Sequence, residues 1–370
     1  MDGGTPDPEF SGELVDYLDK RGSSTYVSLT TKLIMVIPLK SVIISLILII
    51  MCSTALCTTT ASSTPASKNP ATPVTGNATA PPAQPVKLIF LHHSSGENWL
   101  NDNNGGLGAA LRDNNYFVSD TNYGWGLVPE TGSEPIGSLT DIGNWWTWFR
   151  GPESTKIMDA VYAESGQHAS YSRMANDPGG KNRIVMFKSC FPNSNLGGNS
   201  GDIVPPIATN PLKGEDSGSD SHTVANAKGI YIDLLPCFQQ HQDTLFVVIT
   251  APPVSDVKYA SNARVFNQWL VNDWLKDYPY KNVAVFDFYN VLTTNGGSAK
   301  TNDLDKETGN HHRWWQNAVQ HMVDTSGGPH DTTAYASAPG DDHPSKAGNQ
   351  KATAEFVPLL NFAYNQWLAG

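Results

Sequence analysis

The sequence predicts an α/β fold: a single three-layer α/β/α domain with a mostly parallel sheet, spanning residues 86–370. Two observations lead to this prediction. The expected strands are continuous apolar runs, such as VKLIFL at 86–91, as in strands that are buried on both faces. These runs alternate with segments whose apolar residues recur at helical spacing. Alternating strands and helices build a parallel sheet, and active sites in such sheets lie beyond the carboxyl ends of the strands.

The elements follow one another in a regular order from residue 86. The strands are expected at 86–91, 116–119, 184–190, 245–250 and 283–288. The helices are expected at 106–112, at the repeat of Val224, Ala227, Ile230 and Leu234, at the repeat of Phe266, Leu270 and Trp274, and from Ser345 to the end, where Pro358 should bend the last helix. The long stretch 295–339 is expected to be an insertion that shapes the rim of the pocket.

Three segments precede the domain. Residues 1–34 are polar and unpatterned and are interpreted as an unstructured, non-native extension. Residues 35–57 form a signal peptide or a membrane anchor: the apolar core at 41–51 has the length of a signal core, whereas a spanning helix needs roughly 20 residues. Residues 58–85 are a disordered Thr/Ala/Pro-rich linker. We therefore expect a secreted or extracytoplasmic protein that contacts a membrane only if the segment is uncleaved.

Composition excludes some partners. The formal net charge is −11 and no run of Lys or Arg follows residue 60, so nucleic acid is not an expected partner. The cysteines Cys190 and Cys237 show no CxxC spacing, and nothing in the sequence brings them together, although a bridge stays possible in an oxidising compartment. His311, His312 and His321 lack a consistent metal-ligand spacing. We expect no metal and no cofactor.

Candidate catalytic residues stand at three of the predicted element ends. Ser94 follows the first strand, in HHSSG, and either exposes its hydroxyl there or caps the next helix. Asn193 follows the third strand and is either an oxyanion donor, worth roughly 3 kcal/mol, or a turn residue. Before the last helix, Asp341 and Asp342 adjoin His343, where acidic neighbours either orient the imidazole or simply mark a helix start.

In this combination the chain resembles the SGNH (GDSL-type) hydrolase family over most of residues 86–370. In that family a nucleophilic Ser follows strand one, a Gly follows strand two, an Asn follows strand three, and an Asp and a His precede the last helix. The resemblance implies a flavodoxin-like fold with Ser94 as nucleophile and His343 as base. It also implies an oxyanion hole formed by the backbone N–H of Ser94, by Gly124 (alternatively Gly126) and by Asn193.

The sequence departs from the family pattern at three places. His92 and His93 replace the usual Gly-Asp before the serine, and Ser-Cys-Phe-Pro-Asn-Ser replaces Gly-x-Asn-Asp after the third strand. The triad acid normally stands three residues before the histidine, where this chain has Gly340. We therefore predict Asp341 as the acid, with Asp342 as the alternative.

The expected activity is hydrolysis of carboxylic esters through an acyl-enzyme on the serine. The substrate would be an acylated glycan, a lipid or a small ester. An acyltransferase on the same scaffold and an inactive carbohydrate-binding surface protein are the alternatives. Tryptophans are dense enough to suggest a sugar-stacking surface, although core packing is favoured, and Asp287 is expected to be structural. These tryptophans are Trp145, Trp146, Trp148, Trp314 and Trp315.

Overall fold

The computed structural model describes residues 77–130, 132–294, 298–325 and 331–370. The predicted extension at 1–34, the signal or anchor segment at 35–57 and the linker as far as residue 76 lie outside the described residues. Within the described ranges, no helix is both long and apolar enough to cross a membrane.

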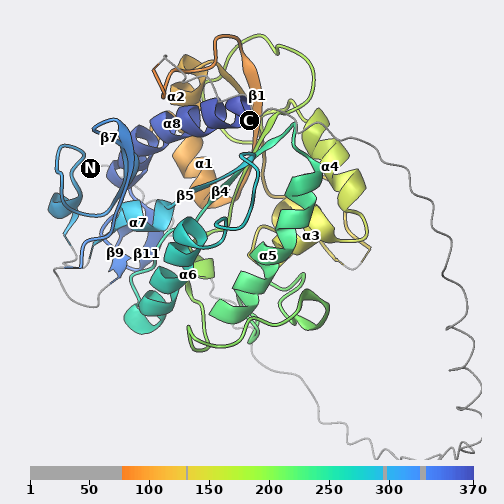
Figure 1. Ribbon diagram of the computed structural model, residues 1–370, viewed down its shortest axis with the longest axis vertical. Helices are drawn as coiled ribbons and strands as arrows, with labels where there is room; N and C mark the ends of the chain where they lie inside the picture. Colours follow the sequence, from red (N-terminus) through yellow and green to blue (C-terminus); the bar gives the residue numbers. More distant parts are fainter. Residues whose placement is uncertain (1–76, 131, 295–297, 326–330) are drawn as a thin grey trace, which may run out of the picture. The chain divides into compact units, whose positions relative to one another are not determined.

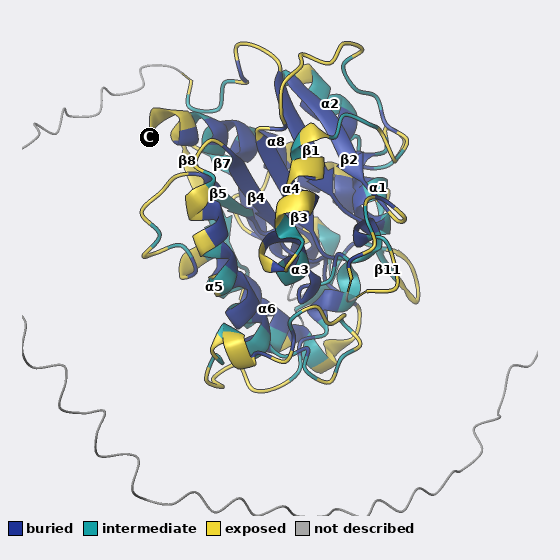
Figure 2. Cartoon of the chain, turned by 90° about the vertical axis from the view of Figure 1, so that its right-hand side faces the viewer, coloured by how far each residue is buried: buried dark blue, intermediate teal, exposed yellow. Residues whose placement is uncertain are grey.

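A five-stranded parallel sheet forms the centre of the fold, which confirms the predicted α/β class. Its spatial order is β2-β1-β3-β4-β5. Every residue of the first four strands is buried, and Figure 2 shows these strands in the interior. The strands are β1 (Val86–Leu91), β2 (Tyr116–Thr121), β3 (Ile184–Lys188), β4 (Leu245–Ile249) and β5 (Val283–Phe286).

Helices cover both faces of the sheet, an arrangement compatible with three α/β/α layers (Figure 1). One face packs against α3 (Asn144–Arg150), α4 (Ser154–Ala163), α5 (Val224–Gln240) and α6 (Ala260–Asn272). The other packs against α1 (Ser94–Leu100), α2 (Leu107–Asp113), α7 (Phe288–Leu292) and α8 (Lys346–Ala369).

Strand β1 shows why both faces need a helical cover. Successive side chains of a strand point to opposite faces. Leu88 and Phe90 lie in the core beneath α1 and α8, whereas Ile89 and Leu91 lie in the core beneath α3 and α5. All four are fully buried, and burying a side chain of this kind stabilises the fold by about 1.5–3 kcal/mol.

The ends of four strands differ from the prediction. Strand β4 ends one residue early, at Ile249. Strand β2 continues to Thr121, because it pairs with β1 as far as Leu91. Strand β3 ends at Lys188, and β5 ends before Asp287. The side chain of Asp287 accepts a hydrogen bond from the backbone N–H of Asn290 and so caps α7, which ends the predicted strand early.

The last helix, α8, begins immediately after Ser345. The Ser345 hydroxyl accepts a hydrogen bond from the backbone N–H of Gly348, a typical N-cap. Pro358 lies inside α8, which continues to Ala369.

The remaining elements are short. The predicted insertion at 295–339 contributes a hairpin and strands that pair with its flanks. The paired strands are β6 (Thr293–Thr294) with β9 (Thr332–Thr333), β7 (His311–Trp315) with β8 (Ala318–Met322), and β10 (Ala336–Ala338) with β11 (Asp341–Pro344). The 3₁₀ turns are η1 (Ile136–Ser138), η2 (Phe191–Ser194), η3 (Ile207–Thr209), η4 (Val257–Tyr259) and η5 (Ala299–Asn302).

The tryptophans belong mostly to the core, as favoured by the sequence. Trp145 and Trp148 of α3 are fully buried, and Trp146 is partly buried against the same core. Trp314 packs on Phe362 of α8, with ring centroids 4.9 Å apart.

The two cysteines of the domain are free thiols. Cys237 is buried in α5, whereas Cys190 is half-buried just beyond β3. The disulfide that the sequence left open is therefore not formed.

Candidate active site

The site lies where the sheet changes its direction of winding. From β1 the chain adds β2 on one side, whereas β3, β4 and β5 are added on the other. The carboxyl ends of β1 and β3 are therefore neighbours at a switch point, the usual place for a ligand in such a sheet. Ser94, the first residue of α1, follows β1 at this point, and Cys190 follows β3.

Ser94, His343 and Asp341 are joined by hydrogen bonds in the structure. Ser94 Oγ lies 2.8 Å from His343 Nε2, although 249 residues separate the two in sequence. On the other side of the ring, His343 Nδ1 lies 2.6 Å from Asp341 Oδ1. Serine, imidazole and carboxylate thus form one continuous chain, in the order that a serine hydrolase requires.

Strand β11 determines which aspartate reaches the histidine. Side chains two residues apart in a strand project to the same side, and adjacent ones project to opposite sides. Asp341 and His343 therefore share a side. Asp342 instead accepts a hydrogen bond from the backbone N–H of Ser255, at 2.8 Å.

The Asp341 carboxylate accepts hydrogen bonds from the His343 ring and from two further donors. Ser337 Oγ of β10 donates to its Oδ2 at 2.7 Å, and the backbone N–H of His343 donates to its Oδ1 at 3.0 Å. These donors, together with the His343 ring, lower the pKa of Asp341 to about 2. Because the carboxylate is charged at neutral pH, it keeps the ring hydrogen on Nδ1 and leaves the Nε2 lone pair facing Ser94.

The backbone N–H of Ser94 is free to stabilise an oxyanion. Within the described residues, no acceptor of the protein meets this group, because it opens the first turn of α1. The N–H of Gly124 donates instead to Ser138 Oγ at 3.1 Å. Gly124 and Gly126 both adopt positive φ, and a Cβ at Gly126 would come within 2.7 Å of Ile136.

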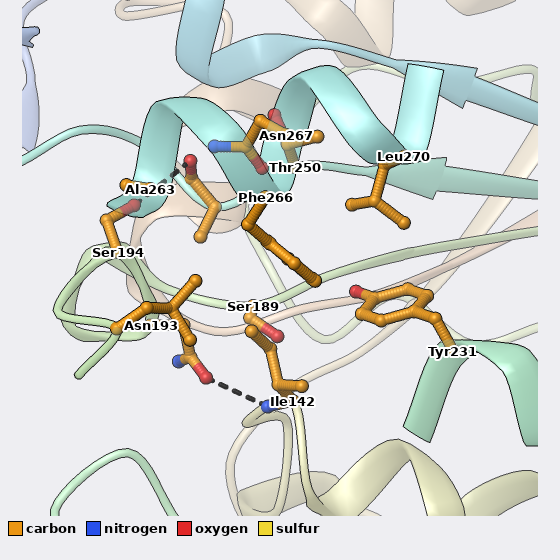
Figure 3. A pocket seen from close by; sticks show the side chains of 12 residues that line it. Ile142, Ser189, Asn193, Ser194, Tyr231, Thr250, Ala263, Phe266, Asn267 and Leu270 are labelled. Atoms are coloured by element: carbon orange, nitrogen blue, oxygen red, sulfur yellow. Dashed lines mark hydrogen bonds between the residues drawn. The ribbon is translucent and has the colours of Figure 1, made fainter. Parts of the chain in front are cut away.

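Asn193 is buried, and its amide is occupied by the protein. Its Nδ2 donates to Asp141 Oδ1 at 2.5 Å and to the carbonyl of Cys190 at 3.3 Å. Its Oδ1 accepts from the backbone N–H of Ile142 at 2.8 Å, the contact drawn in Figure 3. Both amide hydrogens therefore have partners other than a substrate in this structure.

A cavity of about 10 Å³, room for about one water, lies beside Asn193 (Figure 3). Its lining is Ile142, Ser189, Asn193, Ser194, Leu196, Tyr231, Thr250, Ala251, Ala263, Phe266, Asn267 and Leu270. The cavity is too small for an acyl chain.

His92 and His93, which precede Ser94, anchor the loops around it. His92 Nε2 lies 3.1 Å from Asp120 Oδ2, and both side chains are fully buried. The His93 ring stacks on Tyr123 at 4.0 Å, and its Nε2–H donates to the carbonyl of Gly137 at 2.7 Å. Burial lowers the pKa of His93 to about 4, so the ring is neutral at physiological pH.

Three residues that contact Ser94 or its neighbour, namely Lys188, Cys190 and Ser95, were not predicted from the sequence as part of the site. Cys190 Sγ lies 3.7 Å from Ser94 Oγ and 3.2 Å from Ser95 Oγ. Lys188, the last residue of β3, is fully buried and places its Nζ 2.5 Å from Ser95 Oγ. The sequence does contain a signal for Lys188: it is a lysine inside the apolar run IVMFKSC, and a lysine is rarely fully buried unless it is paired.

The histidines of the β7–β8 hairpin have protein partners. His311 pairs with Glu355 and His321 with Asp287, each at 2.8 Å. His312 Nδ1 accepts from the backbone N–H of Asp287. Across the part of the chain that the structure describes, no group of three His, Cys, Asp or Glu side chains is placed to hold a metal ion.

An open groove of about 540 Å³ lies beside Asp341 and His343. Most of its lining groups are polar, and His343 forms part of its wall. The lining is Asn98, Asn104, Ser337, Asp341, His343, Pro344, Ser345, Lys346 and Ala347. A part of the predicted insertion, at Ser337, therefore does border the groove.

Comparison with protein-family models, with curated proteins and with solved structures finds no match to this chain.

Proposed function

We propose that this chain is a serine hydrolase that cleaves carboxylic esters through an acyl-enzyme on Ser94. The observation that carries the proposal is the hydrogen-bonded chain from Ser94 through His343 to Asp341. The strand order β2-β1-β3-β4-β5 is that of flavodoxin-like sheets, which supports the SGNH-type fold.

His343 acts as the base. It takes the hydroxyl proton at Nε2 while Ser94 Oγ attacks the acyl carbon, and the Asp341 carboxylate stabilises the imidazolium that forms. The backbone N–H of Ser94 donates to the developing oxyanion. His343 then returns its proton to the departing alcohol oxygen. In the second half, His343 removes a proton from water, which attacks the acyl-enzyme; His343 then returns that proton to Ser94 Oγ as the acid is released.

The polar groove suits a polar alcohol portion, such as that of an acylated glycan, more than a long hydrocarbon. Because the groove is open, water reaches His343, whose side chain is 27% exposed. Access to water favours hydrolysis over transfer of the acyl group to another alcohol. We further propose that the enzyme works outside the cytoplasm, given the signal-like segment that precedes it.

Hydrolysis of p-nitrophenyl acetate by the purified domain tests this proposal. We expect measurable turnover by the wild type and a fall to the uncatalysed background for Ser94→Ala, with an unchanged melting temperature. Ser200→Ala, at an exposed serine without a hydrogen-bonded partner in the described structure, is the matched control and should keep the wild-type rate.

A Ser94→Ala protein with the full wild-type rate would refute the proposal. Product analysis with an added sugar alcohol distinguishes the alternative activity: an acyltransferase would form the acylated sugar in preference to the free acid.

A further inference from the structure

Lys188 is a buried cation without a counter-ion. Its Nζ donates to Ser95 Oγ at 2.5 Å and to the carbonyl of Ser189 at 3.1 Å. Among the described residues, no carboxylate forms an ion pair with it. The other buried lysines are paired: Lys351 lies 3.3 Å from Glu355, and Lys87 is 3.0 Å from an aspartate.

An unpaired ammonium group at full burial destabilises a fold, because it loses its hydration without gaining a counter-ion. An apolar side chain of similar length would fill the same space without this cost. Departures of this kind from favourable packing are expected at functional sites. The position of Lys188, behind the nucleophile at the switch point of the sheet, points to the same conclusion.

The contacts of Lys188 continue to the nucleophile. Ser95 Oγ, which accepts from Lys188, lies 3.2 Å from Cys190 Sγ, and Cys190 Sγ lies 3.7 Å from Ser94 Oγ. Ser94 Oγ in turn contacts His343 Nε2, and His343 Nδ1 contacts the carboxylate of Asp341.

The two ends determine the direction of the whole chain. An ammonium group can only donate hydrogen bonds, and a carboxylate can only accept them. Each hydroxyl and thiol between them carries a single hydrogen. Because Ser94 donates to His343 Nε2, Cys190 must donate to Ser94 and Ser95 to Cys190, and the Lys188 ammonium, which accepts nothing, leaves the Ser95 hydrogen free for this. In the opposite orientation the Ser94 hydroxyl would point at Cys190, and its proton would not face the base.

We propose that Lys188 is a positioning residue for the nucleophile, acting through Ser95 and Cys190 to direct the Ser94 hydroxyl towards His343. Its charge also stabilises the negative charge that develops at the acyl group during attack, because Lys188 and Ser95 are fully buried and the charge is poorly screened there. This inference rests on the proposed esterase function.

The protonation of Lys188 then gives the rate a pH dependence. Burial lowers the pKa of Lys188 to about 8, with Cys190 acting in the opposite direction. The other titratable group that Lys188 influences is His93, which is neutral above about pH 4. A neutral amine can accept as well as donate, so the imposed direction is lost, and we expect kcat/KM to fall as the pH rises through about 8.

Substitutions along the chain of contacts test the inference, with p-nitrophenyl acetate as substrate. Lys188→Met should lower kcat/KM at pH 7 by about 10- to 100-fold and should remove the alkaline fall. Cys190→Ala and Ser95→Ala each interrupt the chain and should cost about 5- to 10-fold. Cys190→Ser keeps a donor at that place and should restore most of the rate.

Cys190→Ser also identifies the titrating group. A serine does not ionise in this range, so the alkaline fall should persist in this variant if Lys188 causes it. Lys351→Met removes a buried lysine elsewhere and is the matched control, with kcat/KM unchanged.

Stability gives a second readout, which reports the burial and protonation of Lys188 itself, whereas the pH profile of kcat/KM reports its action on Ser94. Because the folded-state pKa of Lys188 lies below the unfolded value of 10.5, the unfolded chain binds more protons between about pH 8 and 10.5. The free energy of unfolding of the wild type should therefore gain a rising contribution across this window, which Lys188→Met lacks. At pH 7, Lys188→Met should be more stable than the wild type.

Wild-type kcat/KM and an unchanged alkaline fall in Lys188→Met would overturn the inference. If that variant does not fold, unaltered rates in both Ser95→Ala and Cys190→Ala would overturn it equally. A wild-type protein that hydrolyses no ester would instead refute the proposed function.

Discussion

Two aspartate–histidine pairs of this protein have nearly the same geometry and very different surroundings. Asp341 and His343 are joined at 2.6 Å, and Asp287 and His321 at 2.8 Å. The Asp341 side chain is 49% exposed and borders an open groove, whereas Asp287 is fully buried behind β5.

The partners of each pair explain the difference in role. The second nitrogen of His343 faces the hydroxyl of Ser94. Within the described residues, no hydroxyl group is hydrogen-bonded to His321, and Asp287 is occupied by the backbone N–H of Asn290. A carboxylate–imidazole pair is therefore not a catalytic site by itself. In the proposed function, it is the Ser94 hydroxyl and the access to substrate that make the Asp341–His343 pair catalytic.

The largest effect expected from this comparison follows from removing the charge of Asp341. Asp341→Asn no longer holds the His343 ring in the required tautomer, and turnover should fall by up to about 10⁴-fold. Asp342→Asn keeps the oxygen that accepts from Ser255 and should have close to the wild-type rate. Turnover of both purified variants near pH 8, with melting temperatures as a check on folding, measures the contrast.

If Asp342→Asn loses its activity and Asp341→Asn keeps it, Asp342 and not Asp341 is the acid that orients His343. Because the pKa of Asp341 is about 2, a loss of activity on mild acidification cannot come from protonation of this carboxylate.

A smaller effect, on stability rather than rate, is expected at the other pair. Asp287→Asn should leave kcat/KM unchanged and lower the free energy of unfolding at pH 7 by about 1–3 kcal/mol, since it removes a charge-assisted hydrogen bond to His321. Chemical denaturation with parallel rate measurements tests both expectations. A tenfold loss of rate with unchanged stability would contradict the structural role.

The pH dependence of this stability difference has a definite sign. Burial by itself raises the pKa of Asp287, but the hydrogen bond and charge of His321 outweigh it, and the pKa lies below its usual value. The folded-state pKa is thus depressed, so the stabilisation is present above the unfolded pKa, near 4, and is lost as the pH falls through the folded value. The difference between wild type and Asp287→Asn should shrink in acid.

The fold class could largely be predicted from the sequence, because the buried strands appear as uninterrupted apolar runs. The position of Ser94 followed from the rule that sites lie at the carboxyl ends of strands, whereas His343 was indicated by its acidic neighbours before the last helix and by the resemblance to the SGNH family. The preference for Asp341 over Asp342 was also available from spacing, although the reason lies in the alternation of side chains along β11.

The residues behind the nucleophile could not be predicted in the same way. The contact between Cys190 and Ser94 depends on the register of β3 against β1, which pairs Leu91 with Phe187 and which no local pattern specifies. The occupied amide of Asn193 depends in turn on Asp141, a residue 52 positions away in a loop. Partners of buried polar groups are set by tertiary structure.

The most direct test of the account is covalent labelling with a fluorophosphonate, followed by mass mapping of the modified residue. Such a reagent reacts with an activated serine hydroxyl, and we expect modification of Ser94 alone, with labelling lost in His343→Ala. Ser95, whose hydroxyl is buried against Lys188, should stay unmodified. Labelling of Ser95 instead of Ser94, or ester hydrolysis by a protein whose Ser94 remains unlabelled, would contradict the central claim.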